Sequence, residues 1–294
     1  MKAILFYLFF AVNWVITLLP LRVLYLFSYP FYVILAWLPG YRKDVIMKNL
    51  ARSFPGKSEK ELKKIRSKFY LHFADLVIES LKLQHMSASE LKKRYRINNP
   101  ELLDRLNSEG RSAIAVFGHY GNWEWIIVAR EFTSYKFLTV YKPLGNKYFD
   151  NYLLKLRSKY GMKLVPMANT LREIVNHQKE GIPTITALVS DQTPPKREIQ
   201  YWTRFLNQDT PVYLGIEKLS TRFNLAVLFF RVRMKRRGYY TIDIETISED
   251  PASLREHEIT ELHVKKLEEQ IIEQPEIWLW SHRRWKHKKP AANG

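Results

Sequence analysis

The sequence contains no cysteine among its 294 residues. Disulfide bonds, thiolate nucleophiles and cysteine-based zinc sites are therefore excluded. Neither an H-E-x-x-H motif nor a G-x-S-x-G turn occurs in the chain, which argues against a zinc protease and against a serine hydrolase built on a nucleophile elbow. Internal repeats and low-complexity segments are also absent, and this length suits one large domain or a domain with appendages.

Acidic residues are missing from residues 1–40, where Lys2 and Arg22 are the only charged side chains. Residues 3–21 form an uncharged run that would extend roughly 28 Å as a helix, close to the thickness of a bilayer core. The run is apolar on all sides, which favours a membrane anchor over a pair of core helices. Its length and the lack of a small-residue cleavage site argue against a cleaved signal peptide. We therefore predict an N-terminal membrane anchor over residues 1–40, which either spans the bilayer or folds back as a hairpin kinked at Pro20.

The formal net charge of +18 is concentrated in patches. Residues 41–70 hold ten basic and three acidic residues, and residues 231–240 and 281–294 each hold five basic residues. Such patches indicate an anionic partner: phospholipid head groups, an acidic carrier protein or nucleic acid. Basic residues directly after the apolar segment predict a cytoplasmic position for the rest of the chain. For the last patch we favour a phosphate or membrane surface over nucleic acid.

From about residue 110, short apolar runs alternate with helical patterns. This alternation predicts an α/β fold, with a mixed, mostly parallel sheet flanked by helices, over a domain at 41–290 that ends in a tail at 291–294. Before the alternation, helices are predicted at 43–54 and 60–83, and Ser87 with Glu90 predicts a capping box. The predicted strands are 112–117, 136–141, 163–166, 184–190, 225–233 and 239–247, and the helices that alternate with them are predicted from about 122 and over 146–160, 169–179, 211–223 and 255–273.

The stretch FGHYGNWEW at residues 117–125 holds a histidine and a carboxylate five residues apart. On a regular helix His119 and Glu124 would point about 140° away from each other. They converge if His119 lies in a turn after a strand and Glu124 lies in the first turn of a helix capped by Asn122. We therefore predict that Glu124 fixes the tautomer of His119, which acts as a general base at the carboxyl end of a strand. Backbone N–H groups at the start of the helix are predicted to stabilise an oxyanion.

The pattern H-x-x-x-x-E after a strand resembles the first motif of the glycerophosphate and lysophospholipid acyltransferase superfamily. The longer stretch GHYGNWEW resembles one branch in particular, the bacterial late acyltransferases of lipid A biosynthesis. Further blocks agree in order, so that the resemblance covers most of residues 1–290. These blocks are RKDVIMKNLARSFP (42–55), VYKPLGNKYFDNYLLKLRSKYG (140–161), SDQTP (190–194) and WLWSHRRWK (278–286).

The resemblance implies an enzyme at the cytoplasmic face of the bacterial inner membrane. It would transfer a fatty acyl chain from acyl carrier protein or acyl-CoA to a hydroxyl of a lipid A precursor or related lipid, without a metal or cofactor. His119 and Glu124 would be catalytic, and Arg157 and Asp191 stand in the places of a motif arginine and a motif acid. Lys142 stands where many relatives have arginine. The predicted substrate-binding residues are Asn122, Lys142, Arg157, Asp191, Arg283 and Arg284.

Other interpretations remain open from the sequence. The acceptor is alternatively a lysophospholipid, an amino-acid-containing lipid or a glycolipid, or the protein is a non-enzymatic adaptor for anionic membranes or nucleic acid. An adaptor does not need the His119/Glu124 turn, which favours an enzyme. Structural explanations also exist for several residues. Arg157 suits a solvated helix face, Asp191 suits a turn, and Arg283 and Arg284 suit ion pairs with acids of the main domain.

Overall fold

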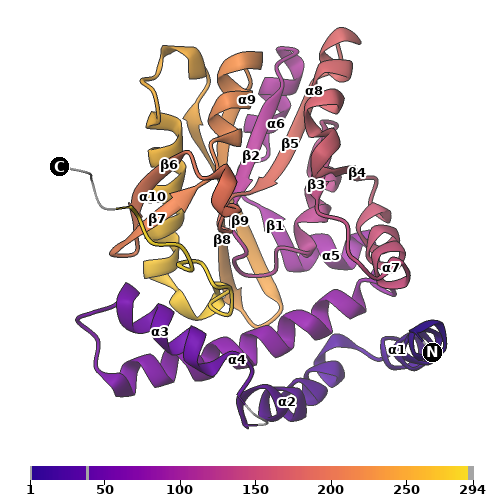
Figure 1. Ribbon diagram of the computed structural model, residues 1–294. Coiled ribbons are helices and arrows are strands. Elements are labelled where there is room, and N and C mark those ends of the chain that lie inside the picture. Colours follow the sequence, from indigo (N-terminus) through magenta and orange to yellow (C-terminus); the bar gives the residue numbers. More distant parts are fainter. Residues whose placement is uncertain (1, 38–39, 291–294) are drawn as a thin grey trace.

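The computed structural model describes residues 2–37 and 40–290; residues 1, 38–39 and 291–294, including the predicted tail, lie outside the described part. A seven-stranded sheet occupies the centre, with helices packed around it (Figure 1). A separate two-stranded hairpin lies beside it. The strands of the large sheet are β1 (Tyr95–Ile97), β2 (Ala113–Phe117), β3 (Lys136–Tyr141), β4 (Lys163–Pro166), β5 (Thr184–Val189), β8 (Ala226–Arg236) and β9 (Tyr239–Ser248), and those of the hairpin are β6 (Tyr201–Phe205) and β7 (Gln208–Val212).

The strand order of the large sheet is β1-β9-β8-β2-β5-β3-β4. All neighbouring strands are parallel except β8 and β9, which form an antiparallel hairpin. The predicted mixed, mostly parallel sheet is therefore confirmed. The register places Phe117, the last residue of β2, beside Val189, the last residue of β5. Residues that follow these two strands consequently meet at one edge of the sheet, where open α/β sheets place their sites.

Helices cover the sheet and cross its carboxyl edge. Most of them follow the predicted periodicity, but the segment expected to be helical from about 122 is a 3-10 helix that begins at Trp125. Its β-branched run at 126–128 disfavours a regular α-helix. The α-helices are α1 (Lys2–Ile16), α2 (Leu21–Trp37), α3 (Lys43–Ser53), α4 (Glu59–Lys82), α5 (Ala88–Arg94), α6 (Glu101–Ser108), α7 (Lys147–Ser158), α8 (Thr170–Lys179), α9 (Gly215–Phe223) and α10 (Glu258–Glu273), and the 3-10 helices are η1 (Trp125–Phe132), η2 (Met167–Asn169), η3 (Lys196–Glu198), η4 (Pro251–Ser253) and η5 (Pro275–Ile277).

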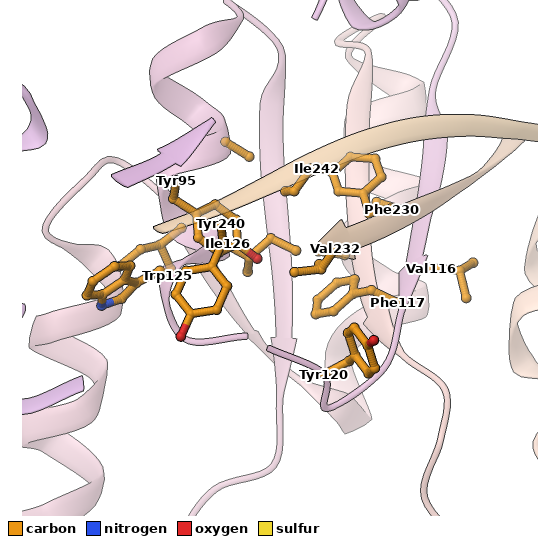
Figure 2. Close-up of a cluster of buried hydrophobic side chains, with 14 of the residues drawn as sticks. Tyr95, Val116, Phe117, Tyr120, Trp125, Ile126, Phe230, Val232, Tyr240 and Ile242 are labelled. Atoms are coloured by element: carbon orange, nitrogen blue, oxygen red, sulfur yellow. The ribbon is translucent and has the colours of Figure 1, made fainter. Parts of the chain in front are cut away.

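The core lies between the sheet and its helices. β2 is buried along its whole length, as expected for a central parallel strand, whereas β9 alternates buried and partly exposed residues. One apolar cluster joins the end of β2 to Trp125 of η1 and Tyr240 of β9 (Figure 2). The rings of Trp125 and Tyr240 pack edge to face with centroids 5.9 Å apart. This packing fixes the segment that follows β2.

The two N-terminal helices keep an apolar surface toward solvent. α2 packs along α4, and α1 contacts α7, where Phe6 stacks on Tyr148 and meets Phe149 edge to face. Within the described residues, none of the helices combines the length and the apolar character needed to cross a membrane. The exposed large apolar residues of this segment are Ile4, Leu5, Tyr7, Leu8, Val12, Trp14, Val15, Leu18, Leu19, Val23, Leu26, Phe27, Tyr29, Val33, Ile34 and Trp37.

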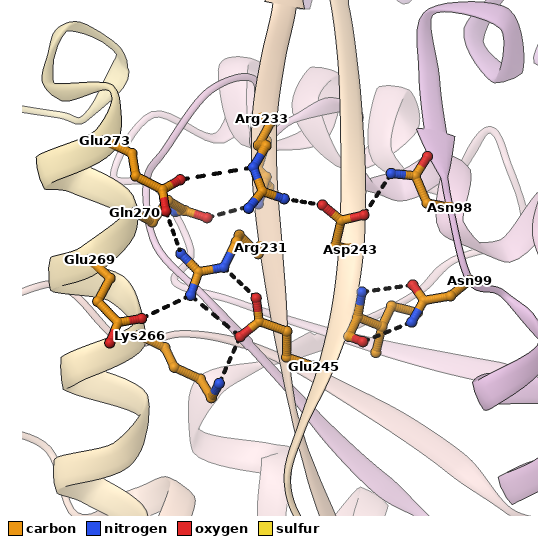
Figure 3. Close-up of polar contacts among 12 residues, drawn as sticks. Asn98, Asn99, Arg231, Arg233, Asp243, Glu245, Lys266, Glu269, Gln270 and Glu273 are labelled. Carbon is orange, nitrogen blue, oxygen red and sulfur yellow. Dashed lines mark hydrogen bonds and ion pairs between the residues drawn. The ribbon is translucent and has the colours of Figure 1, made fainter.

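The basic patch at 231–240 is largely neutralised inside the protein. Arg231 is buried and pairs with Glu245 and Glu269, and Arg233 pairs with Asp243 (Figure 3). In the register of β8 and β9, Glu245 and Asp243 are diagonal neighbours of Arg231 and Arg233, respectively, and Glu269 reaches Arg231 from α10. The prediction that this patch binds an anionic partner is therefore wrong for these two arginines.

Candidate active site

His119 lies in a tight turn directly after β2. Two glycines make the turn possible because side chains would not fit. A Cβ atom at Gly118 would lie 2.8 Å from Leu267 Cδ1, and one at Gly121 would lie 2.9 Å from Val232 Cγ1. Gly121 also has φ +60°, in the left-handed region that glycine adopts without strain. The turn thus brings His119 against the residues that follow β5.

Asp191, which follows β5, is the carboxylate that holds the His119 ring. His119 Nδ1 lies 2.7 Å from Asp191 Oδ1, and the backbone N–H of His119 donates to Oδ2 at 2.8 Å. Trp278 Nε1–H donates to the same Oδ2 at 2.8 Å. Burial raises the pKa of Asp191, but the His119 ring and the donated hydrogen bonds outweigh it and lower that pKa to about 2. Asp191 is therefore a carboxylate at neutral pH.

The second ring nitrogen of His119 faces outward. With Nδ1–H donated to Asp191, Nε2 is an acceptor, and the exposed Gln192 side chain lies 3.3 Å from it through its own Nε2. Burial alone would lower the pKa of His119, but Asp191 and, more weakly, Glu124 raise it, and the net direction is upward. The His119 ring is thus oriented by Asp191 and presents its second nitrogen to the exposed Gln192 side chain.

Glu124 does not contact His119 as predicted. Its carboxylate forms a two-pronged pair with Arg157 of α7, with Nε–Oε2 at 2.8 Å and Nη2–Oε1 at 2.6 Å. The predicted geometry is wrong because η1 begins one residue after Glu124, so the carboxylate turns toward α7, while Asp191 reaches His119 from the neighbouring strand. Arg157 is likewise partly buried against Glu124, which excludes its assignment to a freely solvated helix face.

Asn122 is a structural residue of the turn and is fully buried. Its Oδ1 accepts the Trp125 N–H at 3.0 Å, as expected of a cap, and its Nδ2 donates to Glu79 of α4 at 2.6 Å. A substrate cannot reach this side chain, so the predicted substrate-binding role is wrong. The N–H groups of His119, Tyr120, Gly121 and Trp125 also have acceptors within the protein, which removes them as oxyanion donors.

The predicted basic residues separate into exposed and buried ones. Lys142 is exposed in the segment after β3, and Arg283 is exposed near the C-terminus. Arg284 is only 2% exposed and donates to the Pro211 carbonyl at 2.7 Å and to Thr193 Oγ1 at 3.3 Å. Burial lowers the pKa of Arg284 to about 10. Arg284 therefore holds the C-terminal segment against the domain, and its predicted contact with substrate is wrong.

Three residues near His119 were not identified from the sequence. Gln192 and Trp278 contact the His119–Asp191 pair, and His282 is near enough for Asp191 and His119 to affect its charge. Burial lowers the pKa of His282 to about 4, so its ring is neutral at physiological pH. Gln192 and Trp278 lie inside the blocks SDQTP and WLWSHRRWK, and membership of these blocks was the sequence signal that could have identified them. Among the described residues, no group of three or more His, Asp or Glu side chains is arranged to hold a metal ion.

An oriented histidine at the carboxyl end of a central strand defines a site for general-base chemistry on an open α/β sheet. The family model of the bacterial lipid A biosynthesis acyltransferases matches residues 1–287. The chain therefore belongs to this family and is an acyltransferase that acts on a lipid acceptor, which confirms the resemblance in its sequence.

Among the solved structures to which this chain is similar is that of another acyltransferase. The crystal structure of the 1-acyl-sn-glycerophosphate (LPA) acyltransferase PlsC from Thermotoga maritima is similar at 14% identity and a TM-score of 0.38. The match covers 86% of this chain and 95% of that chain. No curated protein matches this chain.

Proposed function

We propose that the protein transfers a fatty acyl chain from an acyl thioester to a hydroxyl of a lipid A precursor or related lipid, with His119 as general base. One observation carries the proposal. Asp191 binds His119 Nδ1 at 2.7 Å, which leaves Nε2 as the acceptor on the open side of the ring. Nε2 takes the hydroxyl proton while the hydroxyl oxygen bonds to the thioester carbonyl carbon. The carbon–sulfur bond then breaks, and the proton passes to the thiolate that leaves.

The neighbouring side chains have distinct parts in this proposal. Asp191 orients the ring and stabilises the imidazolium that forms. Glu124 adds negative charge near the ring, and Arg157 fixes Glu124 through two hydrogen bonds. The Gln192 amide lies beside Nε2 and is the donor best placed to move onto the carbonyl oxygen as that oxygen becomes charged.

The donor and the location are part of the same proposal. Acyl carrier protein is the donor that suits a chain of net charge +18, with acyl-CoA as the alternative. The exposed apolar face of α1 and α2 supports binding to the cytoplasmic face of the bacterial inner membrane. Residues 1–40 would thus act as the anchor and residues 41–290 as the acyltransferase domain.

The test uses purified full-length protein in detergent with acyl-carrier thioester, acyl-CoA and defined lipid acceptors. Mass spectrometry of the products should show one added acyl chain on a lipid A precursor, and less or none on lysophospholipids, amino-acid lipids or glycolipids. His119→Ala should lower the rate by about 10²–10⁴-fold without a change in melting temperature. Near-normal turnover by folded His119→Ala would rule out the general-base role, and no transfer by the wild-type protein would favour the adaptor.

A further inference from the structure

Glu79 of α4 is a fully buried carboxylate that joins three parts of the molecule. Its Oε1 accepts from the Tyr25 hydroxyl of α2 at 2.6 Å. Its Oε2 accepts from Asn122 Nδ2 at 2.6 Å and from the Tyr240 hydroxyl of β9 at 3.0 Å. No salt bridge to a cation is made by Glu79 within residues 2–37 and 40–290. Burial raises the pKa of Glu79 to about 7 although the three hydrogen bonds lower it, so the carboxylate form depends on all of these neutral donors.

The turn that carries His119 is linked to α4 through this carboxylate and through His72, whose Nε2 lies 3.3 Å from the Gly121 carbonyl oxygen. Among the described residues, the Asn122 amide donates to no side chain other than Glu79, and its Oδ1 accepts the Trp125 N–H that closes the turn. The Trp125 indole N–H also donates to the Glu79 backbone carbonyl at 3.1 Å. A change in the Glu79 carboxylate therefore reaches both ends of the segment between His119 and η1.

Tyr25 of α2 connects the apolar N-terminal helices to Glu79. Its hydroxyl enters the core next to Gly238, where a Cβ atom would lie 2.2 Å from the Tyr25 oxygen. Gly238 has φ +70°, so the turn between β8 and β9 both requires glycine and leaves room for the hydroxyl. The Arg237 guanidinium packs over the Tyr25 ring at 4.2 Å from its centroid. The Tyr25 side chain is thus held by contacts with Glu79, Gly238 and Arg237 of the acyltransferase domain.

We propose that Glu79 is a positioning residue for acyl transfer and that Tyr25 makes the docked α2 helix part of the active-site scaffold. Loss of the Tyr25 hydroxyl leaves Oε1 without a donor in a dry site, and the carboxylate shifts toward its remaining partners. Asn122 and the turn move with it, and the hydrogen bonds from His119 to Asp191 lose their alignment. The inference rests on the proposed function for its kinetic consequence, but the link between α2 and the turn is measurable without turnover.

The test compares Tyr25→Phe and Glu79→Gln with Tyr32→Phe. Tyr32 is a matched control because it also lies on α2 and its hydroxyl bonds to Ser67 of α4 at 2.9 Å, on the exposed side of the same helix pair. Hydrogen exchange in the peptide 118–125 should become faster in Tyr25→Phe and Glu79→Gln and stay unchanged in Tyr32→Phe. Exchange that is unchanged in all three variants would overturn the inference, whatever the enzyme does.

Kinetics separate positioning from loss of folded protein. In Tyr25→Phe and in Glu79→Gln, kcat should fall by up to about 100-fold with little change in KM, because a small misplacement of catalytic groups lowers the rate by about that factor. The pH at which kcat/KM rises should also move down, since His119 loses part of its contact with Asp191. The double variant Tyr25→Phe/Glu79→Gln should be no slower than Glu79→Gln, as expected of residues acting through one contact. A fall in active fraction with an unmoved pH profile and additive losses would contradict the positioning role.

Discussion

His119 is held by Asp191 on one ring nitrogen and meets the exposed Gln192 amide at the other, and in the proposed mechanism this asymmetry sets a pH dependence. The base must be neutral to accept a proton, and its pKa is raised above the ordinary 6.5. We therefore expect kcat/KM to rise with pH through a value above 6.5. In Asp191→Asn, burial acts on His119 without the opposing carboxylate, so the rise should move below 6.5 while kcat falls by about 10²–10⁴-fold. A pH–rate profile of both proteins checks this, and an unmoved profile in Asp191→Asn would contradict it.

Arg283 and Arg284 are adjacent in sequence and differ in surroundings. Arg284→Met leaves the Pro211 carbonyl without its buried donor, which we expect to cost about 1–3 kcal/mol of unfolding free energy. At about 2–4 °C per kcal/mol the loss is visible by thermal melting. Arg283→Gln is the matched control, because Arg283 is exposed, and its melting temperature should not change. Equal melting temperatures for the two variants would show that Arg284 does not hold the C-terminal segment.

The residue scale is where sequence reasoning was least complete. The histidine, its turn and the acid at 191 were predictable from local spacing and block resemblance. The partner of the histidine was not, because Asp191 lies 72 positions away and reaches it only through the register of β2 and β5. Arg284 was misassigned for a related reason: one basic run shows no difference between a side chain that faces water and one that faces the core.

At the scale of elements, α1 and α2 stand out because so much of their apolar surface stays exposed. We expect this surface to bind lipid, so Leu8→Lys should weaken binding to uncharged phosphatidylcholine vesicles by at least about 10-fold, since burial of one leucine is worth about 1.5–3 kcal/mol. Leu8 is 63% exposed, so the substitution should leave the melting temperature unchanged. Vesicle flotation measures the binding. The control is Leu171→Lys on α8, an exposed leucine at the other end of the molecule, and equal binding by both variants would refute the prediction.

Elements with a clear period were well predicted, and those set by distant contacts were not. The strands from β2 to β5 and helices α4 and α8 lie close to their predicted bounds. The hairpin β6–β7 was missed. The helix predicted from 211 begins at Gly215, because residues 208–212 pair with residues 201–205 instead. The capping box also lies elsewhere, at Ser58 with Glu61, while Ser87 only accepts from the Glu90 N–H.

At the scale of the whole molecule, part of the positive charge that remains unpaired lies at the end that carries α4. Lys60 and Lys64 are exposed there and are absent from the salt bridges of the described chain. Lys60→Glu/Lys64→Glu should weaken binding of anionic vesicles or an acidic carrier protein at low salt, and the difference from wild type should shrink toward 0.5 M salt. The control is Arg172→Glu/Lys179→Glu on α8, with the same charge change. Binding constants across a salt series decide the matter, and an equal effect of both variants would indicate net charge alone.

The joining of N-terminal and C-terminal residues has a consequence for how the protein is made. Asn49 of α3 donates to the Trp280 carbonyl at 2.9 Å, across 231 positions, and Arg42 donates to the Ser281 carbonyl at 2.8 Å. α3 therefore leaves the ribosome well before residues 280 and 281, which complete its contacts. At about 5–20 residues per second the wait lasts on the order of ten to fifty seconds. During this interval α3 and the exposed apolar helices before it lack these contacts, so we expect lipid or a chaperone to bind the nascent apolar helices early.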